Sequence, residues 1–368
     1  MDFEVKRANV RECRVVDEEQ RDLEPGQALL RVDAFALTTN NITYAVMGDA
    51  LRYWDFFPAR DDATWGRIPV WGFADVVATT HDDVAEGERV YGYLPMSTHL
   101  VVTPGRVDPR TFVDVSAHRA GLPRAYNQYQ RVDADPSHDR SFDDHRMLLF
   151  PLFFTSFLID DFLEDNGFFD SEAVVVSSAS SKTAIGTAFQ VYQRPGIEVV
   201  GLTSARNAGF IDGLGVYDRV VLYEDVGASG ASGAPGASRA AYVDIAGDAG
   251  VRAAVHRAYG DRLAHSMIVG ATHWDEPAAA AVDLPGPAPS SFFAPDQIAK
   301  RTKDWGRTGL GDRVDDAWRR YVEFCDGWID IQHGSGPAAV EEAYLELVEG
   351  RSDPKTGHAL SMWPQREA

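Results

Sequence analysis

The feature that most constrains the fold is a series of short apolar runs between residues 173 and 270, separated by stretches of helical character. None of the runs alternates polar and apolar residues as a half-exposed strand does, so both faces of these strands should be buried. Strands of this kind linked by helices form a doubly wound parallel α/β sheet of the Rossmann type. The runs are AVVV from Ala173, EVVGLTS from Glu198, RVVLY from Arg219, AAYVDIAG from Ala240 and LAHSMIVG from Leu263.

The first 110 or so residues have a different texture. Short runs of β-forming residues punctuated by Gly and Pro predict a barrel-like, all-β first half. These runs are QALLRVDAFAL from Gln27, VWGFADVVAT from Val70, ERVYGYLPM from Glu88 and HLVVTP from His99. The chain has 368 residues, more than one hydrophobic core usually holds, so we expect two domains.

Three further segments complete the organisation. The Gly/Ala/Ser-rich residues 227–238 predict a flexible surface loop in place of a crossover helix. A Pro-rich stretch, LPGPAPSSFFAP from Leu284, separates the α/β region from the helical pattern DDAWRRYVEFCDGW. The closing segment, from residue 338 onward, predicts a helix, a turn and a strand.

The turn after the first apolar run, SSASSKTAIG at residues 177–186, carries the strongest chemical signal. Small residues allow a tight turn, and the N–H groups that open the following helix face an anion. The dinucleotide fingerprint GxGxxG places glycines in this turn, whereas here only Gly186 keeps a late glycine position. An ordinary turn rich in N-capping serines is the alternative.

The end of the second apolar run indicates which dinucleotide would bind. An NAD-selecting domain carries an acidic residue here for the ribose 2′-hydroxyl, and residues 201–207 contain none. Ser204 and Arg206 instead offer a hydroxyl and a fixed cation, which suit a 2′-phosphate. We therefore predict NADP(H) as the cofactor, the alternative being that Arg206 is a solvated arginine at a helix start.

In the order of these features the chain resembles the medium-chain dehydrogenase/reductase superfamily, particularly its zinc-independent, quinone-oxidoreductase-like members. It also resembles a branch of that superfamily known as a domain of unknown function, DUF2855. The resemblance spans nearly the whole chain, from the helix LFFTSFLIDDFLEDNGFFDSE through AVVVSSASSKTAIGTA and GLTSARN to EEAYLELVEGRSDPKTGHALSMW.

The resemblance implies a GroES-like catalytic barrel at residues 1–150, completed by about 300–368, and a Rossmann NADP-binding domain at 151–299. It implies that the nicotinamide lies in a cleft between them. It also implies a homodimer in which the strand MIVG, near Ile268 at the edge of the Rossmann sheet, pairs across a two-fold axis.

We predict no metal. The zinc-dependent relatives carry Gly-His-Glu where this sequence has Gly72, Phe73 and Ala74, and Phe and Ala side chains cannot ligate zinc. The chain has two cysteines and ten histidines, and the histidines form no recognised ligand motif.

Quinone-oxidoreductase-like relatives carry an Asn and a Tyr beside the nicotinamide. Tyr44 matches that Tyr by spacing, and either Asn40 or Asn41 matches the Asn. A tyrosine could donate a proton or a hydrogen bond to a developing enolate. A half-buried tyrosine at a strand end is the alternative.

The remaining candidates come from position in the chain and from the same resemblance. The predicted cofactor contacts are Ser178, Ala179, Ser180, Ser181, Lys182, Thr183, Gly186, Ser204, Arg206, Tyr223 and Gly270. The predicted substrate contacts are Tyr53, Trp54, Tyr126, Asn127, Phe292 and Phe293. Core packing explains the aromatic members equally well.

Composition excludes several classes of function. A net charge of −21 and a pI near 4.8 repel nucleic acids and anionic lipid surfaces. The most apolar run, residues 147–159, is too short to cross a bilayer, and the start of the chain lacks an apolar signal region. Two cysteines make no disulfide framework, so we expect a cytoplasmic protein.

The predicted function is hydride transfer from NADPH to a carbonyl or an activated C=C bond of a partly apolar small molecule. One alternative is a non-redox enzyme, such as a lyase or isomerase, that keeps this fold with a relic nucleotide site. The other alternative is a binding protein that senses NADPH without turnover.

Overall fold

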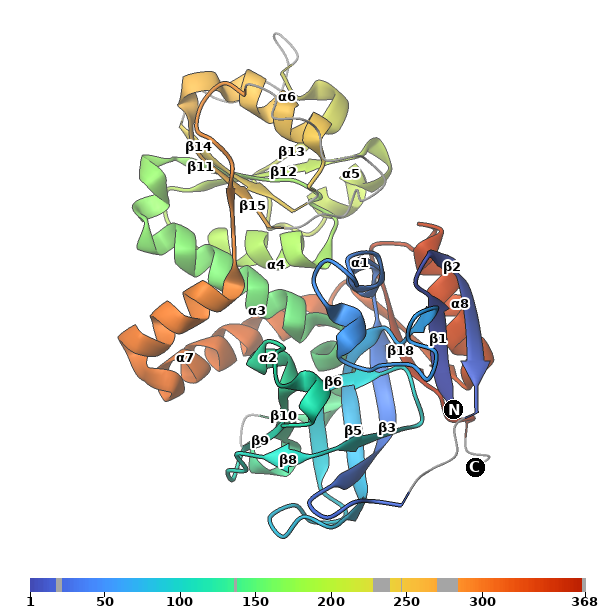
Figure 1. Cartoon of the computed structure of the whole chain (residues 1–368). Coiled ribbons are helices and arrows are strands. Elements are labelled where there is room, and N and C mark those ends of the chain that lie inside the picture. The colour runs from blue at the N-terminus through green and yellow to red at the C-terminus, as the bar shows by residue number, and fades with distance from the viewer. Residues whose placement is uncertain (18–21, 136–137, 228–238, 246, 270–283, 366–368) are drawn as a thin grey trace. The chain divides into compact units, whose positions relative to one another are not determined.

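The computed structural model describes residues 1–17, 22–135, 138–227, 239–245, 247–269 and 284–365 (Figure 1). It divides into two compact units: Met1–Leu148 together with Ile329–Ala368, and Leu149–Trp328. The second unit includes residues 300–328, which the resemblance assigned to the completed barrel. Residues 228–238 of the predicted flexible loop lie outside the described residues.

The second unit contains the predicted parallel sheet. Its strand order is β13-β12-β11-β14-β15-β16, and all neighbouring strands run parallel. Counted along the chain, this is the order 3-2-1-4-5-6 of a Rossmann fold, so the predicted doubly wound sheet is confirmed. The strands are β11 (Ala173–Val176), β12 (Glu198–Thr203), β13 (Arg219–Leu222), β14 (Ala240–Asp244), β15 (Leu263–Ile268) and β16 (Ser290–Ser291).

Burial explains why these runs lack polar alternation. Every residue of β11 and of β14 is buried, because two apolar clusters cover the opposite faces of the sheet. Val174, Val176 and Val243 belong to one cluster, and Val175 and Tyr242 belong to the other. The helices of this unit are α4 (Lys182–Val191), α5 (Ala205–Asp212), α6 (Ala249–Tyr259) and α7 (Ala294–Asp326), with most of α3 (Asp143–Asp165).

The sixth strand corrects one part of the dimer expectation, the pairing of the strand end near Ile268 with a second copy. Ser290 and Ser291 of β16 pair with Met267 and Ile268 of β15. The strand end that we expected to pair with a second copy of the chain is therefore covered within the same subunit.

Helix α7 contains the predicted helical pattern and one break. Gly306 has φ 74° and ψ 164°, a left-handed conformation that interrupts the helix and divides it into two arms. The second arm carries Trp318, Tyr321 and Val322, which are buried at helical spacing.

The first unit is built on two β-sheets. One has the order β17-β18-β3-β5-β6-β10-β9-β8, with β7 also paired to β3, and the other has the order β2-β1-β4. The carboxyl-terminal β18 pairs antiparallel with β3. The strands are β1 (Asp2–Lys6), β2 (Asn9–Val16), β3 (Ala28–Leu37), β4 (Trp65–Gly66), β5 (Pro69–Thr79), β6 (Arg89–Pro95), β7 (His99–Val102), β8 (Pro104–Gly105), β9 (Thr111–Asp114), β10 (Gln128–Arg131), β17 (Asp330–Ser335) and β18 (Thr356–Ser361).

Three α-helices of the described residues belong wholly to this unit: α1 (Thr39–Val46), α2 (Arg124–Asn127) and α8 (Pro337–Val348). Thr38 and Asn41 form a capping box that starts α1. Tyr44 therefore lies on a helix, and not at a strand end. Within the part of the chain that the structure describes, no helix is both long and apolar enough to span a bilayer.

Candidate functional site

The turn after β11 lies where a Rossmann sheet binds its ligand. The strand order reverses between β11 and β14, and ligands of open α/β sheets bind beyond the carboxyl ends of the strands at such a reversal. Residues 177–181 connect β11 to α4 at this point.

The start of α4 is shaped for an anion. Ser181 is the N-cap, and its side chain accepts a hydrogen bond from the Ala184 N–H at 3.2 Å. The N–H groups of the first helical turn and the helix dipole place partial positive charge here. No acidic residue lies in that turn, so the position suits the pyrophosphate of a dinucleotide.

Tyrosine side chains hold the turn in place of the usual glycines. Ser178 has φ 51°, in the left-handed region that glycine favours, and its N–H donates to the Tyr223 hydroxyl at 2.9 Å. The Tyr217 hydroxyl donates to the Ala179 carbonyl at 2.8 Å. Burial raises the pKa of both Tyr217 and Tyr223, so each hydroxyl keeps its proton at neutral pH.

The start of α5 joins this turn. The Asn207 side-chain N–H donates to the Ser180 hydroxyl at 3.0 Å. Ser204 is the N-cap of α5 but forms no side-chain cap hydrogen bond. Arg206 is exposed in the first helical turn, which contains no acidic residue. Among the described residues Arg206 has no ion-pair partner, so its guanidinium is accessible to a phosphate.

Gly201 allows β12 to pass close to the turn. A Cβ atom at Gly201 would lie 2.8 Å from the Tyr217 ring and 3.0 Å from the Ala179 Cβ. Contacts that short do not occur in folded proteins without displacement. Glycine at this position thus leaves room beside β12 for the Tyr217 ring and for Ala179 of the turn.

Gly186 has a packing role. A Cβ atom there would lie 2.7 Å from the Ser156 Oγ of α3. Lys182 and Thr183 both use their backbone carbonyls within the unit: Tyr321 donates to the Lys182 carbonyl at 3.4 Å, and Ser156 donates to the Thr183 carbonyl at 2.8 Å.

Two predicted residues of the second unit lie away from the turn. Phe292 packs edge to face against Phe162 of α3, with ring centroids 5.8 Å apart, and Phe293 is exposed at the N-cap of α7. Phe292 is thus part of an apolar cluster of the second unit. Gly270 lies outside the described residues.

In the first unit, Tyr44 belongs to a tyrosine cluster, which we define as Tyr44, Tyr53, Tyr93 and Tyr126. The ring centroids of Tyr44 and Tyr53 are 4.4 Å apart, and those of Tyr93 and Tyr126 are 4.8 Å apart. Burial raises the pKa of all four hydroxyls. These hydroxyls are therefore neutral hydrogen-bond donors and not bases.

The structure distinguishes the two candidate asparagines. Asn41 is buried; its side-chain oxygen accepts from the Thr38 N–H at 2.8 Å, and its amide donates to the Pro69 carbonyl at 2.9 Å. Asn41 is thus used to hold α1. The polar groups of Asn40 and Trp71 lower the pKa of Tyr44 and so oppose the larger rise that burial causes. Asn40 and Tyr44 are four residues apart on α1 and so lie on the same side of that helix.

Of the other predicted substrate residues in this unit, two lie in the tyrosine cluster and two have structural contacts. Tyr53 and Tyr126 pack edge to face within the cluster, with ring centroids 6.3 Å apart. Trp54 is 4% exposed and packs against the backbone of Gly48 and Gly66, where a Cβ would meet its ring. Asn127 is buried and donates to the Arg119 carbonyl at 3.0 Å. Trp54 and Asn127 therefore have structural contacts.

Tyr93 is the member of the cluster that the sequence did not single out. It is fully buried and lies within 5.1 Å of Trp71 and 5.9 Å of Tyr44, measured between ring centroids. The pairing of Trp71 with Tyr93 between β5 and β6 places it there. The run YGYL from Tyr91 shows alternation typical of a strand, but only the register reveals which face it uses.

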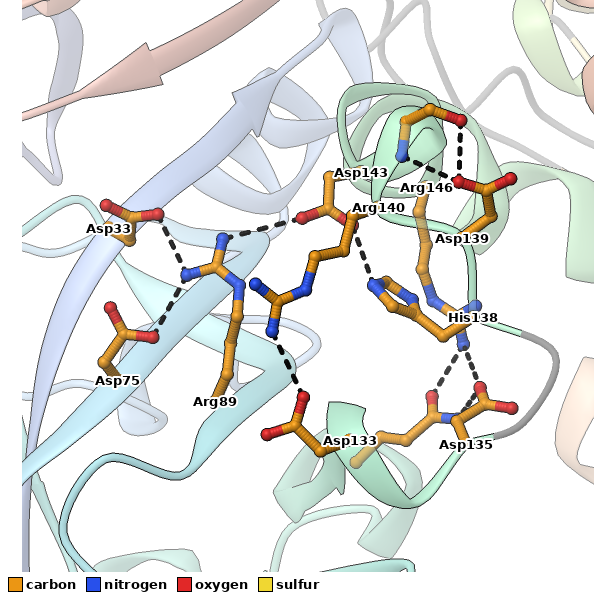
Figure 2. Close-up of polar contacts among 12 residues, drawn as sticks. Asp33, Asp75, Arg89, Asp133, Asp135, His138, Asp139, Arg140, Asp143 and Arg146 are labelled. Carbon is orange, nitrogen blue, oxygen red and sulfur yellow. Dashed lines mark hydrogen bonds and ion pairs between the residues drawn. The ribbon is translucent and has the colours of Figure 1, made fainter.

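Figure 2 shows a second polar region, an arginine network at the start of α3. Arg89 contacts Asp33 at 3.0 Å, Asp75 at 3.1 Å and Asp143 at 3.6 Å, and His138 contacts Asp143 at 2.9 Å. Burial raises the pKa of Asp143 and lowers that of His138. The neighbouring side chains drawn there are Asp133, Asp135, Asp139, Arg140 and Arg146. Every carboxylate of the Arg89 group contacts a cation, which is typical of a structural network that fixes the first turn of α3.

A metal centre finds no support among the residues that the structure describes. They contain no cluster of three or more His, Cys, Asp or Glu side chains arranged to hold an ion. Phe73 is fully buried and packs its ring against Tyr91 and His138, with centroids 5.1 and 5.8 Å apart. Both cysteines are free thiols.

Comparison with protein families gives one match. Residues 35–353 match the family described as protein of unknown function, DUF2855. No curated protein matches the sequence.

Comparison with solved structures gives matches over nearly the whole chain. CurA of Vibrio vulnificus in complex with NADPH has 13% identity and a TM-score of 0.59, with 96% of this chain and 95% of that chain covered. Glucose dehydrogenase of Haloferax mediterranei in complex with NADP, Zn and gluconolactone has 13% identity, a TM-score of 0.57 and 98% of each chain covered. The yhdH oxidoreductase of Salmonella enterica in complex with NADP has 14% identity, a TM-score of 0.52 and 95% of each chain covered. At these identities the likeness confirms the fold, a Rossmann domain with a GroES-like domain.

Proposed function

The chain belongs to the DUF2855 family, described as protein of unknown function, and on that premise we propose that it is an NADPH-dependent oxidoreductase with the medium-chain dehydrogenase/reductase fold. The proposed reaction transfers a hydride to a carbonyl or an activated C=C bond of a partly apolar small molecule. Three of its structural neighbours were solved with NADPH or NADP, which supports the choice of cofactor.

The observation that carries the proposal is the pairing of an anion-binding turn with an exposed arginine at the start of the next helix, α5. The start of α4 offers N–H groups for the pyrophosphate. The start of α5 offers Arg206 and Ser204 for the 2′-phosphate, and no acidic residue that would select NADH. These residues fit NADP(H).

The bound nicotinamide would supply the hydride. In this proposal the Tyr44 hydroxyl donates a hydrogen bond to the substrate oxygen on which negative charge develops. The Tyr44 ring is held by Tyr53 and Tyr93, with ring centroids 4.4 and 5.9 Å away. Because burial raises the Tyr44 pKa, the hydroxyl stays protonated and acts as a donor over the whole neutral range. Tyr53 and Tyr126 would contact the apolar part of the substrate.

Titration of the purified protein with NADPH and NADH, followed by nicotinamide fluorescence, tests the cofactor assignment. We expect selective NADPH binding. The variant Arg206→Ala should weaken NADPH binding by tenfold or more, because a charge-assisted phosphate contact contributes about 1.5–3 kcal/mol, and should leave NADH binding unchanged. The control is Arg257→Ala, which removes another exposed arginine from α6 of the same unit. An equal loss for both cofactors would contradict the assigned role of Arg206.

One observation favours a second candidate, a non-redox enzyme on the same fold. The Ser178 N–H could donate a hydrogen bond to a phosphate, but it already donates one to the Tyr223 hydroxyl. The usual glycines of the turn are also absent. If neither NADPH nor NADH binds, this candidate replaces the first. Product analysis after incubation without any nicotinamide would then identify a lyase or isomerase reaction.

We further propose a cytoplasmic homodimer. Two free thiols are compatible with a reducing compartment. Since β16 covers the end of β15, the dimer contact would involve a surface other than the predicted strand. Sedimentation that gives a mass near 40 kDa at micromolar concentration would contradict the dimer.

A further inference from the structure

A fully buried carboxylate lies at the strand-order reversal of the Rossmann sheet. Asp244 ends β14 and has an exposed fraction of 0%. Its carboxylate accepts hydrogen bonds from the Ser177 hydroxyl at 3.0 Å, the Gly247 N–H at 2.9 Å and the Arg252 guanidinium at 2.8 Å. A buried charge needs such compensation, so Asp244 and its three donors form one hydrogen-bonded cluster.

The same contacts join the two loops that flank the reversal. Ser177 opens the loop into α4, and Ile245 opens the loop into α6. The Ser177 hydroxyl donates to Asp244 and accepts from the Ile245 N–H at 3.0 Å, and the Ser177 N–H donates to the Val243 carbonyl at 3.1 Å. Both the hydroxyl and the backbone of Ser177 are therefore fixed against β14.

Ser177 is followed directly by the strained residue of the turn. Ser178 has φ 51° without being a glycine, and such a conformation persists only where the surroundings over-determine it. A GxGxxG turn would obtain the same path from glycine itself. In this chain the contacts of Ser177 on one side and Tyr223 on the other impose it.

We propose that Asp244 is a positioning residue that holds the phosphate turn, residues 177–181, in the conformation that binds the pyrophosphate of a dinucleotide. This inference rests on the proposed function and deepens it. Asp244 acts through Ser177 and does not touch the ligand. It differs from Arg206 in that it affects every ligand with a pyrophosphate equally, whether or not a 2′-phosphate is present.

The experiment compares Asp244→Asn and Ser177→Ala with the control Asp160→Asn. Asp160 is also buried and paired, with Arg194 at 2.6 Å, but it lies on α3. Binding of NADPH, NADH and ADP is measured well below each melting temperature. Both test variants should bind all three ligands about tenfold more weakly, the equivalent of one hydrogen bond of ~1.4 kcal/mol. Asp160→Asn should lose melting temperature and keep its affinities. Unchanged affinity in both test variants, or an equal loss in the control, overturns the proposal.

Amide hydrogen exchange of the ligand-free protein separates this inference from the cofactor proposal. If the wild type binds no nucleotide, the proposed function fails, and the exchange rates of residues 178–184 still report on the turn. We expect faster exchange there in Asp244→Asn and Ser177→Ala, with no change in Asp160→Asn. Unchanged exchange in the test variants would show that Asp244 does not hold the turn. Ser177→Ala keeps this test available if the loss of a buried charge prevents Asp244→Asn from folding.

Discussion

At the scale of single residues, Ser178 has a backbone conformation that suits glycine better than serine. Its φ of 51° costs a residue with a side chain about 1–3 kcal/mol, and glycine adopts it freely. The gain from glycine is offset in part by the larger conformational entropy of the unfolded chain. We expect Ser178→Gly to raise the free energy of unfolding by about 1 kcal/mol, measured by urea denaturation of the ligand-free protein.

The control for this prediction is Ser180→Gly in the same turn. Ser180 is not among the residues with positive φ, and its hydroxyl accepts a hydrogen bond from Asn207. Glycine there should lower the stability. If both variants are destabilised alike, the turn does not store strain at Ser178.

His265 links stability to pH. Its ring stacks on Phe169 with centroids 3.9 Å apart, and burial lowers its pKa from 6.5. The unfolded chain therefore binds a proton at higher pH than the folded protein does. The contribution of His265 to stability is complete above about pH 6.5 and is lost as the pH falls toward the lowered folded-state value.

We expect the melting temperature to decrease between pH 7 and pH 5, and the decrease to be smaller in His265→Gln. His99, His118 and His138 also have pKa values lowered by burial, so a part of the decrease should remain. His333→Gln, at an exposed position where the ring contacts Asp144 at 2.7 Å, is the control for replacing a histidine and should not make the decrease smaller. Parallel slopes in all three proteins would refute the assignment to His265.

At the scale of elements, the crossing of α4 over α3 depends on a glycine. A Cβ at Gly186 would lie 2.7 Å from the Ser156 Oγ and 3.4 Å from the Tyr321 hydroxyl. We expect Gly186→Ala to lower the free energy of unfolding by about 1–3 kcal/mol, since overpacking forces such helices apart. Gly209→Ala is the matched variant on α5, where a Cβ meets nothing within 4 Å. It should raise stability by about 0.5–1 kcal/mol. Denaturant midpoints at constant m-value compare the two, and equal signs would contradict the packing account.

The elements that could be predicted from the sequence are those whose pattern is local. The five long parallel strands follow from runs buried on both faces, and the turn at residues 177–186 follows from its position between such a run and a helix. Strand β16 could not be predicted because its two serines carry no apolar signal. It is a strand only through its pairing with Met267 and Ile268 of β15. The helix α1 was missed because it is rich in Thr and Asn, which are poor helix formers. A capping box at its start stabilises the helix.

The same limit applies to the candidate site. The residues of the phosphate turn are consecutive, so one motif finds most of them. The tyrosine cluster is assembled from α1, β6 and α2 together with Tyr53, and Tyr93 joins it through the register of β5 against β6. Register depends on long-range pairing. A single sequence therefore identified Tyr44, Tyr53 and Tyr126 as separate candidates but could not show their contact.

At the scale of the whole molecule, charge is unbalanced. The chain has 56 acidic and 35 basic residues, a net charge of −21, and such an excess destabilises the folded state through self-repulsion. When salt screens this repulsion, the weakening of favourable ion pairs does not cancel the gain in stability. Arg119 and Asp114 are 0% and 2% exposed and are shielded from ions, whereas exposed pairs such as Arg319 with Asp316 contribute little.

Salt should therefore stabilise this protein at neutral pH. The Debye length falls from about 10 Å at 0.1 M to about 3 Å at 1 M salt, which screens repulsion between neighbouring carboxylates. We expect the melting temperature at pH 7.5 to rise by at least about 2–4 °C between 0.05 M and 1 M NaCl, corresponding to about 1 kcal/mol. Near pH 4.8, where the net charge is close to zero, the same increase in salt should have little effect. A melting temperature that falls with salt at pH 7.5 would mean that exposed ion pairs outweigh the repulsion. An equal rise at both pH values would mean that NaCl acts through the hydrophobic effect and not through charge.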